Sequence, residues 1–161
     1  MSSGITAEDW QRLLDRWGGP LELFAAQWTD SPEDCVQEAF LQLARQTKWP
    51  DNVAAWLFRV VRNRAIGLAR SASRRRKHET RAAQWTTDAA IGPVIGDSTD
   101  SLEVLQTLTD ELREIVVARV WGELGFEQLA EVFDISAATA FRRYESALRV
   151  LRDRMGVTCR D

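Results

Sequence analysis

The chain has 161 residues, of which 45% are hydrophobic, and a formal net charge of −3. This length fits one ordinary domain or two small ones. No stretch approaches the run of about 20 apolar residues that crosses a bilayer. The N-terminus also lacks the basic and then apolar pattern of a secretory signal. We therefore expect a cytoplasmic protein that makes no contact with a membrane.

The cysteine and histidine content excludes a disulfide framework and a zinc site built from cysteine or histidine pairs. The chain has two cysteines, Cys35 and Cys159, in different halves, and one histidine, His78. We expect Cys35 to be a core residue and Cys159 a thiol in the C-terminal tail. A glycine-rich phosphate loop and a paired nucleophile and base are missing as well. The sequence thus predicts no metal, no cofactor and no enzymatic activity.

The charge is distributed in blocks along the chain. Residues 59–81 contain nine basic residues and one acidic residue, whereas the following segment, from Asp88 to Glu114, is mainly acidic. Basic residues return between Arg142 and Arg154. Separate blocks of this kind predict two anion-binding surfaces, with acidic regions that face protein partners.

The pattern of apolar residues predicts an all-α fold, because no alternating apolar and polar run is long enough for a strand. The first helix is expected at residues 7–17, with Thr6 as its cap. Gly18, Gly19 and Pro20 should end it, and a second short helix should follow at residues 21–28.

The third helix should start at residue 32, because Ser31 is a good capping residue and Pro32 fits the first helical position. Its apolar stripe at helical spacing runs from Val36 to Leu43. Residues 49–52 should break the chain before a fourth helix that begins near Val53.

Residues 82–100 predict a flexible linker, because they are small, polar and interrupted by glycine and proline. The linker separates an N-terminal unit, residues 1–81, from a C-terminal unit, residues 101–161. The sequence therefore predicts two small helical domains. The helices expected in the C-terminal unit are residues 102–108, 111–121, 126–133 and 137 to about 155.

The C-terminal unit contains a helix-turn-helix pattern at residues 125–140. Asp134 lies in the tight turn, where aspartate tolerates the left-handed backbone that glycine usually adopts. Phe141 can either touch a thymine methyl group or pack against the unit. The alternative for the whole pattern is a plain helical hairpin with solvated arginines. The side chains expected to cap the second helix or to reach bases and phosphates in a major groove are Ser136, Thr139, Arg142 and Arg143.

One face of the fourth helix combines an aromatic ring, an amide and a row of arginines. This set suits nucleic acid with exposed bases, since the ring can stack, the amide can read a base edge and the arginines can follow the backbone. The alternative is that Trp56 is a core residue and the arginines are a solvated surface. Arg64 projects instead among apolar residues, where we expect it to snorkel or to pair with a carboxylate of the third helix. At 3.6 residues per turn the face consists of Trp56, Arg59, Arg62, Asn63, Gly67, Arg70 and Arg74.

Both units, in this order and at this spacing, resemble the extracytoplasmic-function (ECF) group of sigma-70-type sigma factors. The N-terminal unit has the acidic-then-Val-Gln-Glu-x-Phe and Trp-Leu-x-Arg-x-x-x-Asn patterns, which are specific when they occur together. The stretches that carry the resemblance are residues 31–40, residues 55–65, and residues 112–117 followed by the helix-turn-helix through Arg143.

The resemblance implies a sigma factor that takes core RNA polymerase to promoters and starts transcription there. The implied partners are the β′ clamp helices and the β flap of the polymerase, promoter DNA, and an anti-sigma factor as a further candidate. The third helix would dock on the clamp helices through Asp34, Gln37, Glu38 and Leu41.

The resemblance also implies how promoter DNA is divided between the two units. The C-terminal helix would read the minus-35 element through Ser136, Thr139, Arg142 and Arg143. Phe141 and Ser146 stand where many relatives carry basic residues, which shifts weight to the two arginines. The fourth helix would read the minus-10 element, with Asn63 at the position that contacts a flipped-out base. The residues expected at the minus-10 element are Trp56, Arg59, Arg62, Asn63 and Arg70.

The alternative function is a stand-alone helix-turn-helix regulator that binds duplex DNA as a dimer. Such a protein would leave the arginine face of the fourth helix without a role. A heptad seam through which it could dimerise is also not visible in the sequence.

Overall fold

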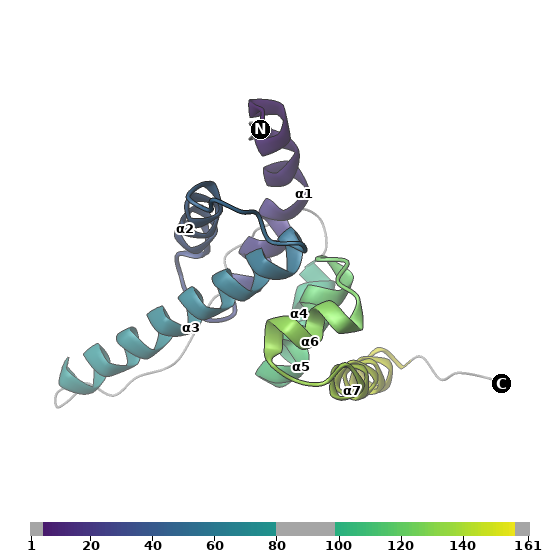
Figure 1. Ribbon diagram of the computed structural model, residues 1–161. Helices are drawn as coiled ribbons and strands as arrows, with labels where there is room; N and C mark the ends of the chain where they lie inside the picture. The colour runs from purple at the N-terminus through teal and green to yellow at the C-terminus, as the bar shows by residue number, and fades with distance from the viewer. Residues whose placement is uncertain (1–4, 80–98, 157–161) are drawn as a thin grey trace.

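The computed structural model describes residues 5–79 and 99–156 (Figure 1). The expected linker lies outside these ranges except for its last two residues, which belong to a helix, and Cys159 lies outside them too. Within the described ranges the chain forms seven helices and no strand, so the all-α prediction is confirmed. The helices are α1 (Ala7–Ala25), α2 (Pro32–Ala44), α3 (Val53–Glu79), α4 (Thr99–Gln106), α5 (Asp110–Val120), α6 (Phe126–Phe133) and α7 (Ala137–Met155).

Helix α1 is continuous through Gly18, Gly19 and Pro20, so the prediction of two helices separated by a break was wrong. Proline removes one hydrogen bond from a helix interior and disfavours the helical conformation before it. The residues that follow are nevertheless deeply buried, Leu21 and Phe24 among them. Packing of this C-terminal half against the rest of the protein offsets the local cost, because tertiary contacts override weak helix propensity.

Helix α2 starts with Pro32 at its first position, as predicted. The side chain of Ser31 makes no capping hydrogen bond, so that part of the prediction was wrong. The carboxylates of Glu33 and Asp34 lie in the first turn, where they complement the positive end of the helix dipole. Cys35 is fully buried on the inner side of the helix, as expected.

Helix α3 is the longest element, and in Figure 1 its C-terminal half extends away from the other helices. Asn52 stabilises the start of the helix, since its Oδ1 accepts a hydrogen bond from the Ala55 backbone N–H at 3.0 Å. The first half buries Leu57, Phe58 and Val61 completely. The opposite side of α3 is thereby left open to solvent.

Helices α6 and α7 form the expected helix-turn-helix. Asp134 adopts the left-handed conformation, with φ 54° and ψ 49°, at the end of α6. The Oγ of Ser136 accepts a hydrogen bond from the Thr139 backbone N–H at 3.1 Å and so caps α7. Both predictions about this turn are confirmed.

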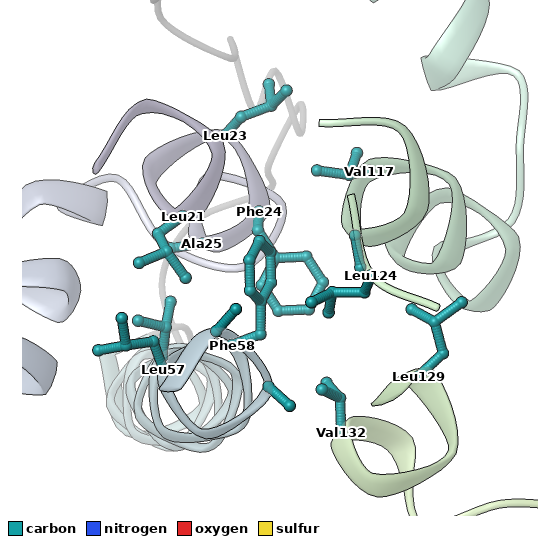
Figure 2. Packing of buried hydrophobic residues seen from close by; sticks show 14 of the residues in the cluster. Leu21, Leu23, Phe24, Ala25, Leu57, Phe58, Val117, Leu124, Leu129 and Val132 are labelled. Atoms are coloured by element: carbon teal, nitrogen blue, oxygen red, sulfur yellow. The ribbon is translucent and has the colours of Figure 1, made fainter. Parts of the chain in front are cut away.

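The N-terminal unit (α1 to α3) and the C-terminal unit (α4 to α7) share one apolar core, which the sequence did not reveal. The Phe24 ring lies 5.1 Å from the Phe58 ring and 6.1 Å from the ring of Phe133, measured between centroids. Figure 2 shows Phe24 and Phe58 between the two units, with Leu124 directed toward the two rings. The two units therefore pack closely in this arrangement, which we call the closed arrangement.

Candidate DNA and polymerase interfaces

The open side of α3 presents part of the predicted minus-10 face. Arg59, Asn63 and Arg70 are exposed there. Trp56 is half-buried and packs against the core, and stacking of a base on its exposed part stays a prediction. An amide and two guanidinium groups thus form a polar surface that can meet bases and phosphates.

Arg62 belongs to the same predicted set but is bound by the C-terminal unit. Its Nε donates to Oε2 of Glu114 at 3.0 Å, and its Nη2 donates to Oε1 of the same carboxylate at 3.3 Å. The Arg62 Cζ also lies over the Phe133 ring, 5.2 Å from the centroid. The side chain of Arg62 is therefore only 26% exposed.

Glu114 and Phe133 were not expected as site residues from the sequence. Glu114 directly precedes the apolar run from Ile115 to Ala118 in α5, and a carboxylate that is buried beside such a run needs a partner. That requirement does not identify the partner, which is 52 residues away along the chain.

The electrostatics of Glu114 are dominated by burial, because its side chain is only 5% exposed. Burial raises the pKa of the Glu114 carboxyl group, and the nearby charge of Glu111 raises it further. The hydrogen bonds and the charge of Arg62 lower this pKa, as does the charge of Arg143, but burial is the largest contribution. Glu114 therefore lies within the electrostatic influence of one arginine from each predicted DNA-reading helix.

Arg64 is exposed rather than enclosed by apolar residues. Burial raises the pKa of the Cys35 thiol, and the charge of Arg64 opposes that rise. Arg64 is therefore exposed while its charge still acts on the buried thiol of α2.

The N-terminal end of α7 presents the predicted minus-35 residues. The Thr139 hydroxyl accepts hydrogen bonds from the Ser136 hydroxyl at 2.8 Å and from Nη2 of Arg142 at 3.3 Å. Arg142 is exposed, whereas Arg143 is half-buried. The first turn of α7 is therefore held by its cap, with one guanidinium directed outward.

Phe141 lies in the same N-terminal part of α7 and is 45% exposed. Its ring packs edge-on against Phe126 of α6, with centroids 5.2 Å apart. The structure thus shows the packing alternative for Phe141, and a contact with a thymine methyl group stays a prediction.

The predicted polymerase-binding residues lie together on α2. Asp34, Gln37 and Leu41 are exposed, and Glu38 is half-buried. A groove of about 640 Å³ separates α2 from α1 beside Gln37 and Leu41. The groove is lined by Trp10, Leu14, Gly18, Gly19, Glu22, Glu33, Val36, Gln37, Phe40, Leu41 and Ala44.

The contribution of α1 to this groove was missed at the sequence level. Leu41 is 51% exposed, and Leu14 of α1 is also exposed. Two leucines at outward positions of neighbouring helices, Leu41 and Leu14, were the feature of the sequence that could have indicated an apolar docking groove. Burial raises the pKa of Glu22 in the groove, and the charge of Glu33 adds to that rise.

Residues 5–79 and 99–156 contain no cluster of three histidine, cysteine or acidic side chains that could hold a metal ion. In the same part of the chain, no helix combines the length and the apolar character needed to cross a membrane.

Comparison with known proteins assigns both units. The model of the family described as Sigma-70 region 2 matches residues 13–75, and that of Sigma-70, region 4 matches residues 104–153. The chain therefore belongs to the sigma-70 family of RNA polymerase sigma factors. It is an initiation factor that binds core RNA polymerase and promoter DNA, and its family points away from an enzyme.

A solved structure has a similar fold over most of the chain. It is the sigma factor RpoE from Bartonella quintana, in a co-crystal structure with the anti-sigma factor NepR. The identity is 23%, the TM-score is 0.72, and the match covers 94% of this chain and 99% of that one. No curated protein sequence matches the chain significantly.

Proposed function

We propose that this sigma factor divides its work among three surfaces. The exposed side of α3 reads the minus-10 element, the N-terminal end of α7 reads the minus-35 element, and the surface of α2 docks on polymerase. One observation carries this proposal: the two DNA-reading surfaces lie on different helices of different units. Asn63 is exposed on α3 between Arg59 and Arg70, whereas Arg142 is exposed near the capped start of α7.

At the minus-10 element, Asn63 is assigned the flipped-out base, while Arg59, Arg62 and Arg70 follow the backbone. Trp56, which is half-buried, is assigned to stacking on a base. At the minus-35 element, Ser136 and Thr139 position the start of α7, and Arg142 and Arg143 provide the base and phosphate contacts. The residues that we assign to the minus-35 element are therefore Ser136, Thr139, Arg142 and Arg143.

For the polymerase, we assign Asp34, Gln37, Glu38 and Leu41 as contacts of the β′ clamp helices. The apolar groove supports this assignment, because Leu14 and Leu41 offer apolar surface at its two sides and polar side chains form the rim. We assign the β flap to the C-terminal unit by family resemblance.

The domain limits that we propose are residues 1–81 for the region 2 domain, 82–100 for the linker and 101–161 for the region 4 domain. The family matches fall inside these limits. Helix α4 begins at Thr99, so it includes the last two residues of this linker.

We further propose that the chain has no catalytic activity of its own. We also propose that it works in the cytoplasm, where polymerase and promoters are found. An anti-sigma factor is a further partner, since the structural relative RpoE was crystallised with the anti-sigma factor NepR.

Run-off transcription tests the proposal directly. Core polymerase that has been reconstituted with the chain should initiate at specific promoters selected from a random DNA library, whereas core polymerase alone should not. A chain that binds duplex DNA as a sequence-specific dimer, and that does not change promoter choice by polymerase, would instead favour the stand-alone regulator.

A further inference from the structure

The contact between Arg62 and the C-terminal unit has the form of a nucleotide contact. The Glu114 carboxylate accepts hydrogen bonds from Nε and Nη2 of Arg62 at 3.0 and 3.3 Å. A guanidinium group offers this two-donor edge equally well to a carboxylate and to a phosphate. The Phe133 ring, 5.2 Å from Cζ, occupies the flat side of the guanidinium, where an unstacked base would stack.

We propose that Glu114 and Phe133 are an internal mimic of the minus-10 strand, which occupies Arg62 in the closed arrangement and which promoter DNA must displace. The carboxylate takes the place of a phosphate, and the phenyl ring takes the place of a base. The proposal rests on the proposed role of Arg62 at the minus-10 element, and it adds a means by which the C-terminal unit controls that role.

Burial supports a competition rather than simultaneous binding. The Glu114 side chain is 5% exposed, so the carboxylate covers the donor edge of Arg62 and is itself covered by the protein. A phosphate cannot take the same two donors while Glu114 holds them. The other charges that act on this carboxylate are those of Glu111 and Arg143.

The closed arrangement is also too small to read both promoter elements at once. The two elements are about 25 base pairs apart, which is about 85 Å along the duplex at 3.4 Å per base pair. A compact chain of this length has a radius of gyration of about 15 Å. The units must therefore separate on a promoter, and separation releases Arg62 from Glu114 and Phe133.

Charge reversal at Glu114 tests the proposal in the full chain. Glu114→Arg places a third cation beside Arg62 and Arg143, and this should separate the units. Glu103→Arg is the matched control, because it makes the same change of charge at an exposed position of the same unit, and Glu103 is not among the charges that act on Glu114. The probe is a short single-stranded DNA rich in A and T, titrated by fluorescence anisotropy at fixed salt, since salt alone changes such affinities.

The expected result is that Glu114→Arg binds the probe about fivefold or more tightly than Glu103→Arg does, a typical coupling between two sites. The radius of gyration from small-angle scattering should also increase in Glu114→Arg alone. Adding Arg62→Ala should abolish the difference in affinity, because the released group is then missing. Equal affinity for the two charge reversals, or a difference that persists without Arg62, would overturn the proposal.

A second pair of variants keeps the test decisive if circular dichroism shows that Glu114→Arg does not fold. Glu114→Gln should bind the probe more tightly than Glu103→Gln, and equality would overturn the mimic. A failure of the minus-10 role itself would be recognised separately, since Asn63→Ala would then bind the probe like the unaltered chain. If Asn63→Ala weakens binding but the Glu114 variants match their controls, only the mimic is wrong.

Discussion

Gly122 lies directly against the ring of Phe58, across the boundary between the two units. A Cβ atom at Gly122 would stand 2.6 Å from the Phe58 Cζ and 2.9 Å from its Cε2, and 2.5 Å from the Ala118 carbonyl oxygen. Contacts this short do not occur, so the backbone of the α5–α6 turn approaches α3 only because residue 122 has no side chain. The approach fixes how closely the shared core can pack.

Gly122→Ala should therefore destabilise the protein by about 1–3 kcal/mol, the usual cost of overfilling a packed core. Gly67→Ala is the matched control, because a Cβ at that exposed position of α3 meets nothing within 4 Å. The control should raise stability by about 0.5–1 kcal/mol, since alanine favours helix interiors over glycine. Urea denaturation measures both changes.

A double-variant experiment on Gly122 and Phe58 tests the contact between the units. In a Phe58→Leu background the cost of Gly122→Ala should shrink, because the ring atoms are gone while the clash with the Ala118 carbonyl oxygen remains. A cost that is the same in both backgrounds would mean that the turn and α3 do not touch in solution.

Polymerase binding should depend on the outer face of α2. Replacing Gln37 and Glu38 together with alanine should weaken binding to core polymerase by about tenfold or more, since central interface contacts often cost above 1 kcal/mol each. Helical content should not change, because neither side chain is part of the apolar core. Gln46→Ala, at an exposed position after the end of α2, should bind core polymerase normally. Surface plasmon resonance with immobilised core enzyme gives the affinities, and normal binding by the double variant would place the docking surface elsewhere.

The pH dependence of stability should carry a contribution from Glu114. Burial raises the pKa of this carboxyl group above its ordinary value of 4.5, and Arg62 opposes the rise only in part. The folded protein then holds a proton that the unfolded chain has already released. The free energy of unfolding should therefore fall as the pH rises from about 4.5 through the raised pKa.

Glu114→Gln should lack this fall, because an amide does not titrate. Urea denaturation of both proteins at several pH values isolates the contribution as the difference between the two curves. Glu22, whose pKa is also raised, titrates in both proteins and cancels from the difference. If the two curves of unfolding free energy against pH ran parallel above pH 4.5, the pKa of Glu114 would not be raised by burial.

Local rules predicted much of this molecule from its sequence. The positions of α6 and α7, the left-handed Asp134 and the capping hydroxyl of Ser136 follow from turn chemistry and apolar spacing alone. The break expected at Gly18 to Pro20 was wrong because local propensity was outweighed by the burial of Leu21 and Phe24, which depends on partners far along the chain.

The residues on one helix face of the candidate site were predictable from the sequence, whereas the contacts between the two units were not. Helical periodicity placed Arg59, Asn63 and Arg70 together, since it needs no knowledge of other helices. It also placed Arg62 on that face and could not foresee Glu114, because a pairing across 52 residues is decided by how the two units dock. The exposed Leu14 beside α2 escaped notice for the same reason.

The division of promoter reading between the units is the central claim, and it separates strand opening from duplex recognition. Asn63 lies on α3 and Arg142 on α7, so the two alanine variants should fail at different steps. Asn63→Ala should bind duplex promoter nearly normally but open it poorly, and a premelted template should reduce the defect. Arg142→Ala should lose about 1–3 kcal/mol of binding on both templates, as expected for a base contact.

The most direct measurement is a permanganate footprint of each variant holoenzyme on a promoter selected with the unaltered holoenzyme, combined with binding titrations on duplex and premelted templates. We predict that Asn63→Ala loses reactive thymines at the minus-10 element while duplex affinity is retained. Arg142→Ala should lose duplex affinity, and the complexes that still form should open normally. Equal defects of the two variants at both steps would contradict the division of labour between α3 and α7.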